Sequence, residues 1–285
     1  MAYNFFSNHF IRIFCRRLGL PRRQVYNFVR ALSFASPDRC GENHILDCVN
    51  ADAGKSLINE ELGYFRFDKN QSSGLKDVVA DCMGIYHHKH SQYDADYFVK
   101  NPNKGFLLTL ASDQELMKIA SISNFITSDF VLNTVCSYLQ QPFVLSTIRL
   151  WWSVVNDTEI RSQKFHLDDE DLSQIKLFVN INDVSEDHGP FRFIDAVNSE
   201  NIISCYRHGK RRFSDDEISA STDKVPIISL TGTAGEGGFV DTSRCLHFGS
   251  RANKHDRLVL MAQFLRYDAP LLRGSLPVEA RTDRD

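Results

Sequence analysis

The feature that most restricts the fold of this chain is a succession of short apolar runs that begins after Pro142. Each run is rich in β-branched and aromatic residues, and Gly, Pro, Asn or Asp separates it from the next, as is typical of strands and turns. Several short strands in succession are typical of a sandwich or a barrel. We therefore predict a β-rich core over about 142–268. Its runs are FVLSTIRLWWSVV, IKLFVNINDV, GPFRFIDAV, VPIISLTG, GGFVDTS and RLVLMAQFLRY.

The chain before this core has helical patterns. Residues 72–140 contain DQELMKIASISNF and SDFVLNTVCSYLQQ, and Ser128 followed by Asp129 is a good helix N-terminus for the second of these. At 285 residues the chain is long enough to bury a large core. We predict a β-rich α+β protein whose main domain spans 61–285 and ends in a tail at 269–285.

Residues 1–60 form a separate basic segment and connection. Between residues 4 and 34, apolar side chains recur at spacings of three and four, which predicts an amphipathic helix, and six arginines precede the first acidic residue, Asp38. A helix that packs on the body of the protein is the simpler interpretation. The alternative is a surface that contacts an anionic membrane or partner.

Composition excludes several classes of protein. A formal charge of -3 argues against a general nucleic-acid binder, which would need a basic surface. No run approaches about 20 apolar residues, so we expect no transmembrane segment, and arginines interrupt the first apolar stretch, which makes it a poor secretion signal. The seven scattered cysteines include no CxxC pair and favour reduced thiols. We predict a cytoplasmic protein.

His166 and Asp168 are a candidate pair of metal ligands. Residues at i and i+2 of an extended chain project to the same side, and two imidazoles with one carboxylate are the ligands of non-haem Fe(II) oxygenases. His247, at the end of a later apolar run, is the candidate for the second imidazole. For the pair alone, a polar turn before a strand is the alternative interpretation.

Arg257 begins the last apolar run and is a candidate anion-binding residue. By strand alternation it shares a face with Val259, Met261 and Gln263. A buried charge needs a partner, and a guanidinium can hold a carboxylate through two parallel hydrogen bonds.

Together these pieces resemble the phytanoyl-CoA dioxygenase-like family of Fe(II)/2-oxoglutarate-dependent oxygenases. The resemblance covers roughly residues 140–268 and implies a double-stranded β-helix, a jelly-roll or cupin-like core with helices packed outside. It implies that His166, Asp168 and His247 hold Fe(II), and that Arg257 binds the distal carboxylate of 2-oxoglutarate. The matching pieces are His166-Leu167-Asp168, KLFVNINDVSEDHGPFRFI, CLHFGSR and Arg257.

The implied reaction is that of an oxidoreductase. Such a dioxygenase uses O2 to convert 2-oxoglutarate to succinate and CO2 and hydroxylates an unactivated C–H bond, here of a small or medium metabolite. Asp168 favours hydroxylation over halogenation, because related halogenases carry a small residue at this position. Desaturation and ring formation stay open. The alternatives are a non-catalytic cupin-like binding or regulatory module and a metal-dependent hydrolase, in which Arg257 would have no evident role.

The chain departs from the family pattern next to the distal histidine, and other basic residues compete for the cosubstrate. Many relatives carry Ser or Thr two residues after the distal histidine, where this chain has Gly249 followed by Ser250. Lys176 is a tentative contact for the cosubstrate, with a solvent-facing lysine as an equal alternative. Arg251 competes with Arg257 for the keto acid but lies in a polar turn, which ranks it lower.

Two further segments carry candidate residues. The stretch 204–217 is predicted to be a loop that caps the site and offers Arg207 and Arg211 to an anionic substrate, with a solvated charged loop as the alternative. The sequence HHKH at 87–90 has the residue types of a Zn or Ni site. A solvated polar segment is the preferred interpretation of HHKH.

Overall fold

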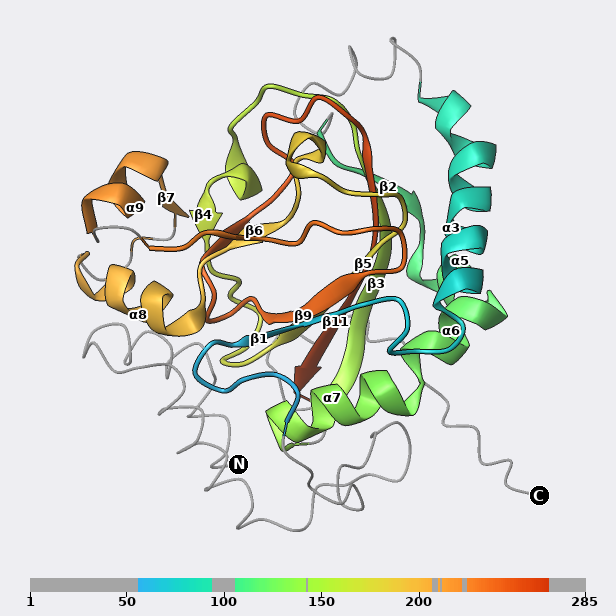
Figure 1. Ribbon diagram of the computed structural model, residues 1–285, viewed down its shortest axis with the longest axis horizontal. Coiled ribbons are helices and arrows are strands. Elements are labelled where there is room, and N and C mark those ends of the chain that lie inside the picture. The colour runs from blue at the N-terminus through green and yellow to red at the C-terminus, as the bar shows by residue number, and fades with distance from the viewer. Residues whose placement is uncertain are drawn as a thin grey trace, which may run out of the picture.

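Figure 1 shows a computed structural model of the protein. The basic segment at residues 4–34 and the tail at 269–285 lie outside the described residues, so the helix expected at 4–34 and its membrane or partner contact stay predictions. The domain boundaries likewise stay predictions. The structure describes residues 56–93, 106–141, 143–206, 210, 212–221 and 225–266.

Two antiparallel sheets form the core (Figure 1). Within the described chain the larger sheet has six strands, in the order β1 (Tyr64–Phe67), β9 (Gly237–Asp241), β5 (Ile175–Asn180), β11 (Arg257–Arg266), β3 (Phe143–Ser153) and β2 (Leu108–Ala111). The smaller has five, in the order β7 (Arg212–Phe213), β4 (Phe165–His166), β10 (His247–Phe248), β6 (Arg192–Phe193) and β8 (Ile228–Ser229). Neighbouring strands are mostly distant in sequence, as in a jelly roll. No described strand of one sheet pairs with the other sheet, so the core is an open sandwich and not a closed barrel.

The side chains of β11 alternate between two apolar layers, as the sequence predicts. Leu258 and Leu260 pack in the layer between the larger sheet and its helices. Val259 and Met261 pack in the layer between the two sheets, against side chains of both, including Phe193. The face that begins with Arg257 is therefore the inner face of the sandwich.

Helices cover the outer faces of both sheets (Figure 1). On the larger sheet these are α3 (Leu75–Lys89), α5 (Asp113–Met117), α6 (Ala120–Ile126) and α7 (Asp129–Leu139). The side chain of Ser128 caps α7 by accepting a hydrogen bond from Val131 N at 3.4 Å, which confirms the predicted helix start. The run DQELMKIASISNF forms two helices and not one, because Ile119 adopts an extended backbone (φ −85°, ψ 115°) between α5 and α6.

Three segments differ from the sequence-based expectation. Strands β1 and β2 precede residue 142 and form the two edges of the larger sheet, so β2 interrupts the span expected to be helical. The run GPFRFIDAV ends as a strand at Phe193, because Asp195 accepts a hydrogen bond from Asn198 N at 2.9 Å and starts helix α8 (Ala196–Ser204). The expected loop at 204–217 contains β7 and the beginning of α9 (Asp215–Ser221). Together α8 and α9 cover the outer face of the smaller sheet (Figure 1).

Two further expectations concern membranes and thiols. None of the described helices has the length and apolar character needed to cross a membrane. The expectation of reduced thiols is wrong for Cys136, which is disulfide-bonded, because spacing along the sequence does not report which cysteines meet in space. Cys82, Cys205 and Cys245 are free. The cytoplasmic location stays a prediction.

Candidate functional site

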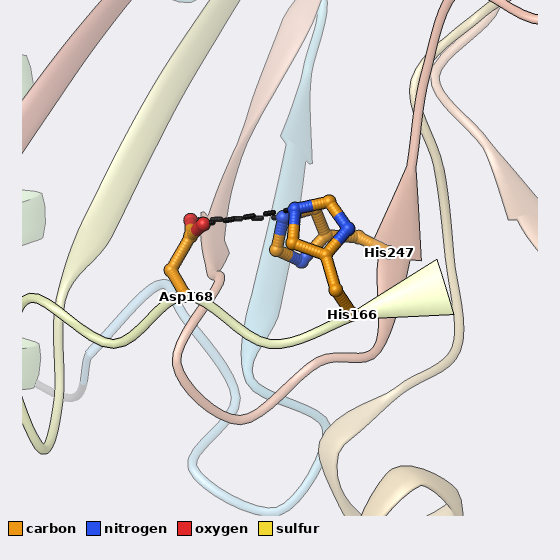
Figure 2. Close-up of side chains that lie close together, drawn as sticks. All are labelled: His166, Asp168 and His247. Carbon is orange, nitrogen blue, oxygen red and sulfur yellow. Dashed lines mark ion pairs between the residues drawn. The ribbon is translucent and has the colours of Figure 1, made fainter. Parts of the chain in front are cut away.

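The fold brings His166, Asp168 and His247 together on the inner face of the smaller sheet (Figure 2). His166 and His247 lie directly opposite each other in the β4–β10 pair, with ring centroids 4.3 Å apart. Asp168 follows β4, and its backbone N donates to Thr242 O at 2.9 Å. Its Oδ1 lies 3.8 Å from His166 Nε2, and its Oδ2 lies 3.6 Å from His247 Nε2. One ligand atom from each residue lies within 4.8 Å of the others.

Backbone carbonyls orient both imidazoles. His166 Nδ1 lies 2.8 Å from Lys164 O, and His247 Nδ1 lies 2.9 Å from Cys245 O. A carbonyl oxygen can only accept a hydrogen bond, so each Nδ1 carries the proton and each Nε2 presents its lone pair to the space beside Asp168. This is the orientation that histidine ligands of metals adopt.

The electrostatics of the cluster favour the protonation states of metal ligands. Burial, together with the neighbouring His247, lowers the pKa of His166 to about 3. Burial alone would raise the pKa of Asp168, but the charge of Lys176 and the contact with His247 hold that pKa well below its usual value. At neutral pH His166 is therefore neutral and Asp168 is ionised, as metal binding requires.

Two donors hold the Asp168 carboxylate from the direction of β5. Lys176 Nζ lies 2.7 Å from Asp168 Oδ2, and only 13% of the lysine side chain is exposed. The Nε2 of Gln174 donates to the same oxygen at 3.1 Å and to Thr242 Oγ1 at 3.0 Å. Lys176 therefore points into the sandwich and not to solvent. Its next neighbour on the same face, Phe178, belongs to the layer between the sheets.

Arg257 is a buried cation without an anionic partner among the described residues. Its exposed fraction is 4%. Its Nη2 donates to Ser250 Oγ at 3.0 Å and to Ser153 Oγ at 3.3 Å, whereas its Nε has no hydrogen-bond partner in the described structure. Burial lowers its pKa to about 10. By contrast, the equally buried Arg266 meets the carboxylate of Asp171 at 2.8 Å.

Arg251, the competing arginine, has its partners elsewhere. Its Nη2 lies 2.8 Å from Asp215 Oδ2 and its Nη1 lies 3.0 Å from Glu159 Oε1. Its guanidinium carbon lies 3.8 Å from the ring centre of Phe248, which belongs to the outer layer under α8 and α9. Arg251 therefore lies on the outer face of the smaller sheet.

Ser153 and Ser250 were missed by the sequence reasoning. Ser250 adopts a left-handed backbone with φ of 56°, and this conformation lets a serine placed three residues after His247 reach Arg257. A side chain at Gly249 would also come near, because an added Cβ would lie 3.6 Å from Arg257 Nη2. The available signal was the serine after Gly249. The position of Ser153 opposite Arg257 depends on the strand register, which the sequence does not report.

The remaining candidate residues are Arg207, Arg211 and the HHKH segment. Arg207 and Arg211 lie outside the described residues, whereas Lys210 pairs with Glu217. In the HHKH segment, His90 Nδ1 lies 3.0 Å from Tyr86 O, and its ring stacks on Tyr86 at 4.9 Å. Within the described part of the chain, the only group with the geometry of a metal site is the His166 cluster.

Comparison with known proteins extends the description of the fold. No protein-family profile and no curated protein matches the sequence. Among solved structures, EctD from S. alaskensis with 2-oxoglutarate and 5-hydroxyectoine is similar, with a TM-score of 0.50 and 12% identity over 88% of this chain and 91% of that one. The epimerase SnoN with Fe3+, alpha ketoglutarate and nogalamycin RO gives a TM-score of 0.48 and 12% identity, over 77% of this chain and 84% of that one. HygX from Streptomyces hygroscopicus with nickel and 2-oxoglutarate gives a TM-score of 0.48 and 11% identity, over 73% of this chain and 84% of that one. At these identities the likeness concerns the fold alone.

Proposed function

We propose that the protein is an Fe(II)- and 2-oxoglutarate-dependent oxygenase that acts on a small or medium metabolite. The observation that carries the proposal is the combination of the His166–Asp168–His247 cluster with Arg257, a buried guanidinium that no described carboxylate contacts. Among the solved structures named above, EctD contains 2-oxoglutarate, according to its title, and has a similar fold. Its sequence is too distant to carry the function by itself.

The residues of the site fit both a divalent metal and a dicarboxylate. Two imidazole nitrogens and one carboxylate are suitable ligands for Fe(II) and leave coordination positions open. On the inner face of the larger sheet, Arg257 Nε, Asn180 Nδ2 and Gln263 Nε2 are buried donors without acceptors among the described residues. Unsatisfied buried donors are costly, so a ligand rich in acceptors would stabilise this face.

Each group of residues then has a distinct task. His166, Asp168 and His247 would hold the metal, and Arg257 would bind the distal carboxylate of the keto acid with Ser153 and Ser250 fixing the guanidinium. When bound, iron would supply the oxidising chemistry together with 2-oxoglutarate and O2: one oxygen atom of O2 enters an unactivated C–H bond, and the other enters succinate as 2-oxoglutarate loses CO2.

Aromatic side chains form an apolar wall of the site. The ring of Phe191 lies 5.2 Å from His247 and stacks on Phe178 at 4.2 Å. Such an apolar wall would keep water away from the proposed metal ligands, and this would strengthen the electrostatic contacts made there. The carboxylate of Asp168 fills the position that related halogenases leave open, which supports hydroxylation over halogenation.

The proposal extends to substrate and location as follows. The substrate is a small molecule, and its anionic character rests on Arg207 and Arg211, which the structure does not describe. Lys176 would contact the cosubstrate at the metal end of the site. The cytoplasm is the proposed location.

The two alternatives explain fewer observations. A metal-dependent hydrolase would use the same three ligands but leaves the buried charge of Arg257 without a role. A non-catalytic cupin-like module has no need of both a complete ligand set and a desolvated guanidinium. Turnover separates this second alternative from the enzyme.

The test is anaerobic reconstitution with Fe(II) and 2-oxoglutarate, followed by absorption spectroscopy of the metal-to-ligand charge-transfer band. We expect the band in the wild type and its loss in His166→Ala. Arg257→Met should raise the 2-oxoglutarate concentration needed for the band, whereas Arg251→Met, which alters an arginine on the outer face, should not. Absence of the band in the wild type would refute the proposed function. Succinate released on adding O2 then distinguishes an enzyme from a silent binder.

A further inference from the structure

Gln263 carries a buried amide to which the proposed function gives no separate task. It lies on the inner face of β11 and is 6% exposed, yet its Nε2 has no hydrogen-bond partner among the described residues. We propose that Gln263 is a specificity-determining residue that donates a hydrogen bond to a neutral carbonyl oxygen of the metabolite, such as that of an amide or a lactam. This inference rests on the proposed function, because it names a chemical feature of the substrate of the same site.

An apolar band separates Gln263 from the other two buried donors of this face. Arg257 and Asn180 lie together at one end, because Asn180 is opposite the residue two positions after Arg257. Met261 and Phe178 come next and lie opposite each other, and both belong to the apolar layer between the sheets. Gln263 follows beyond them. The three donors therefore form two groups with an apolar surface between them.

One molecule of 2-oxoglutarate is too short to satisfy both groups. Gln263 lies six positions after Arg257 on β11, and an extended strand covers about 20 Å in that number of residues. The guanidinium of Arg257 stays at its own end, because its Nη2 donates to Ser153, the residue directly opposite on β3. A five-carbon dicarboxylate built from bonds of about 1.5 Å is about 7 Å long, and a hydrogen bond at each end adds only about 3 Å. The acceptor for Gln263 therefore belongs to a second ligand, and in the proposed reaction that ligand is the metabolite.

Gln263 nevertheless lies beside the proposed metal ligands. Lys176 is directly opposite on β5, so the two side chains share the inner face of the sheet. Residues opposite each other in an antiparallel pair have Cα atoms about 5 Å apart. Lys176 Nζ in turn lies 2.7 Å from Asp168 Oδ2. A metabolite held by Gln263 would therefore present its neighbouring carbon atoms to the metal end of the site.

The charges around Gln263 favour a neutral acceptor over a carboxylate. The strands on either side offer two cations, Lys176 on β5 and Arg149 on β3. Each of them already has a carboxylate partner, which is Asp168 for the lysine and Asp113 for the arginine. A carboxylate of the substrate would be buried here without a cation of its own, whereas a carbonyl oxygen needs only a donor. The amide of Gln263 is such a donor.

The experiment uses 2-pyrrolidinone, a small cyclic amide, as the probe. Ligand-detected NMR titration measures its affinity for the protein loaded with Zn(II) and 2-oxoglutarate, so no turnover is needed. Gln263→Met is similar in volume but has no donor, and it should weaken lactam binding roughly fivefold to tenfold, the contribution of one hydrogen bond. Its affinity for 2-oxoglutarate should stay unchanged. The matched control is Gln92→Met, in an exposed turn at η4 (His90–Gln92), which should change neither affinity.

Acetate tests the preference for a neutral acceptor. It should bind the wild type and Gln263→Met with the same affinity, because the amide is not expected to hold a carboxylate. Acetate binding that depends on Gln263 as strongly as lactam binding does would overturn the preference. The proposal is also overturned if the wild type does not bind the lactam or if Gln263→Met binds it equally well. Weaker 2-oxoglutarate binding in Gln263→Met would assign the amide to the cosubstrate instead.

Stability of the ligand-free protein gives a second readout. Methionine removes a buried donor that lacks an acceptor, so the thermal midpoint of Gln263→Met, followed by circular dichroism, should be equal to that of the wild type or higher. A lower midpoint would show that the amide has an internal partner in solution, and this would contradict the proposal. Failure of the proposed function has a different signature, because the wild type would then bind no 2-oxoglutarate. The lactam titration repeated on the metal-free protein still supports or overturns the contact with Gln263 in that case.

Discussion

Replacement of Arg257 by methionine should leave the ligand-free protein as stable as the wild type or more stable, although the arginine is buried in the core. Burial lowers the pKa of Arg257 from 12.5 to about 10, which corresponds to a cost of about 3 kcal/mol for keeping the charge in the folded state. This cost is present in full at every pH below about 10 and therefore at neutral pH.

The hydrogen bonds that the substitution removes offset part of this gain. Arg257 donates to Ser153 and Ser250, and each bond contributes about 1 kcal/mol. The two hydroxyl groups still bond to each other after the change, so neither is left unsatisfied. We expect the free energy of unfolding to stay unchanged or to rise by up to about 2 kcal/mol.

Arg266→Met is the matched comparison, because this arginine is equally buried but makes a complete ion pair. Its removal takes away the guanidinium that the fully buried Asp171 contacts at 2.8 Å, and the free energy of unfolding should fall by about 3–5 kcal/mol. Urea unfolding followed by circular dichroism measures both variants. If Arg257→Met loses as much stability as Arg266→Met, Arg257 has an internal partner in solution and the argument for an anion site fails. In the Co(II)-loaded wild type 2-oxoglutarate should raise the unfolding midpoint, and in Arg257→Met it should not.

The remaining predictions concern pH, backbone space and thiols. The unfolded chain protonates His166 near pH 6.5, whereas the folded chain protonates it only near pH 3. Through this residue, the free energy of unfolding of the metal-free protein should therefore fall by about 1.4 kcal/mol per pH unit between these values. His166→Gln should flatten that slope when the free energy of unfolding is measured at a series of acid pH values. Gly237→Ala should lower the free energy of unfolding by more than about 3 kcal/mol, because the new Cβ would lie 1.9 Å from Phe178 O. Gly84→Ala, on an open helix face, should raise the free energy of unfolding by about 1 kcal/mol. Chemical denaturation of both variants tests this pair of predictions. Cys205→Ser should remove one thiol that Ellman's reagent detects in the native protein, whereas Cys82→Ser should remove none, because burial raises the pKa of Cys82 to about 12.

The strand pattern explains why the position of Arg257 was predictable. An alternating strand assigns every second residue to one face, so the relation of Arg257 to Val259 and Met261 follows from the order of residues alone. The histidine pair was a candidate from residue types and strand positions, and the family resemblance supported it. Nothing in the local sequence places residue 247 opposite residue 166, a contact that depends on the order of strands in the sheet.

Lys176 shows where sequence reasoning ends. Its strand was predicted, but the choice between the inner face and solvent depends on which side of β5 meets the second sheet. The residues between Asp168 and Lys176 reverse the direction of the chain, so that Lys176 Nζ lies 2.7 Å from Asp168 Oδ2. Edge strands β1 and β2 were missed for a related reason: four residues are too few for alternation to be distinguished from a short apolar stretch in a loop.

Many relatives carry Ser or Thr two residues after the distal histidine, where this chain has Gly249. Ser250 shows that this departure does not remove the serine contact with Arg257. A serine at position 249 would approach the guanidinium from an ordinary backbone, whereas Ser250 reaches the same Nη2 at 3.0 Å by adopting a φ of 56°. For a residue other than glycine this conformation has an energetic cost, so something must hold it. The side-chain amides of Asn156 and Gln163 donate to Ser250 O at 3.1 Å and 2.6 Å. Two residues far from every recognised motif therefore fix the backbone of Ser250 beside Arg257. Substituting Gln163 should disturb the proposed keto-acid end of the site while leaving the proposed metal ligands in place.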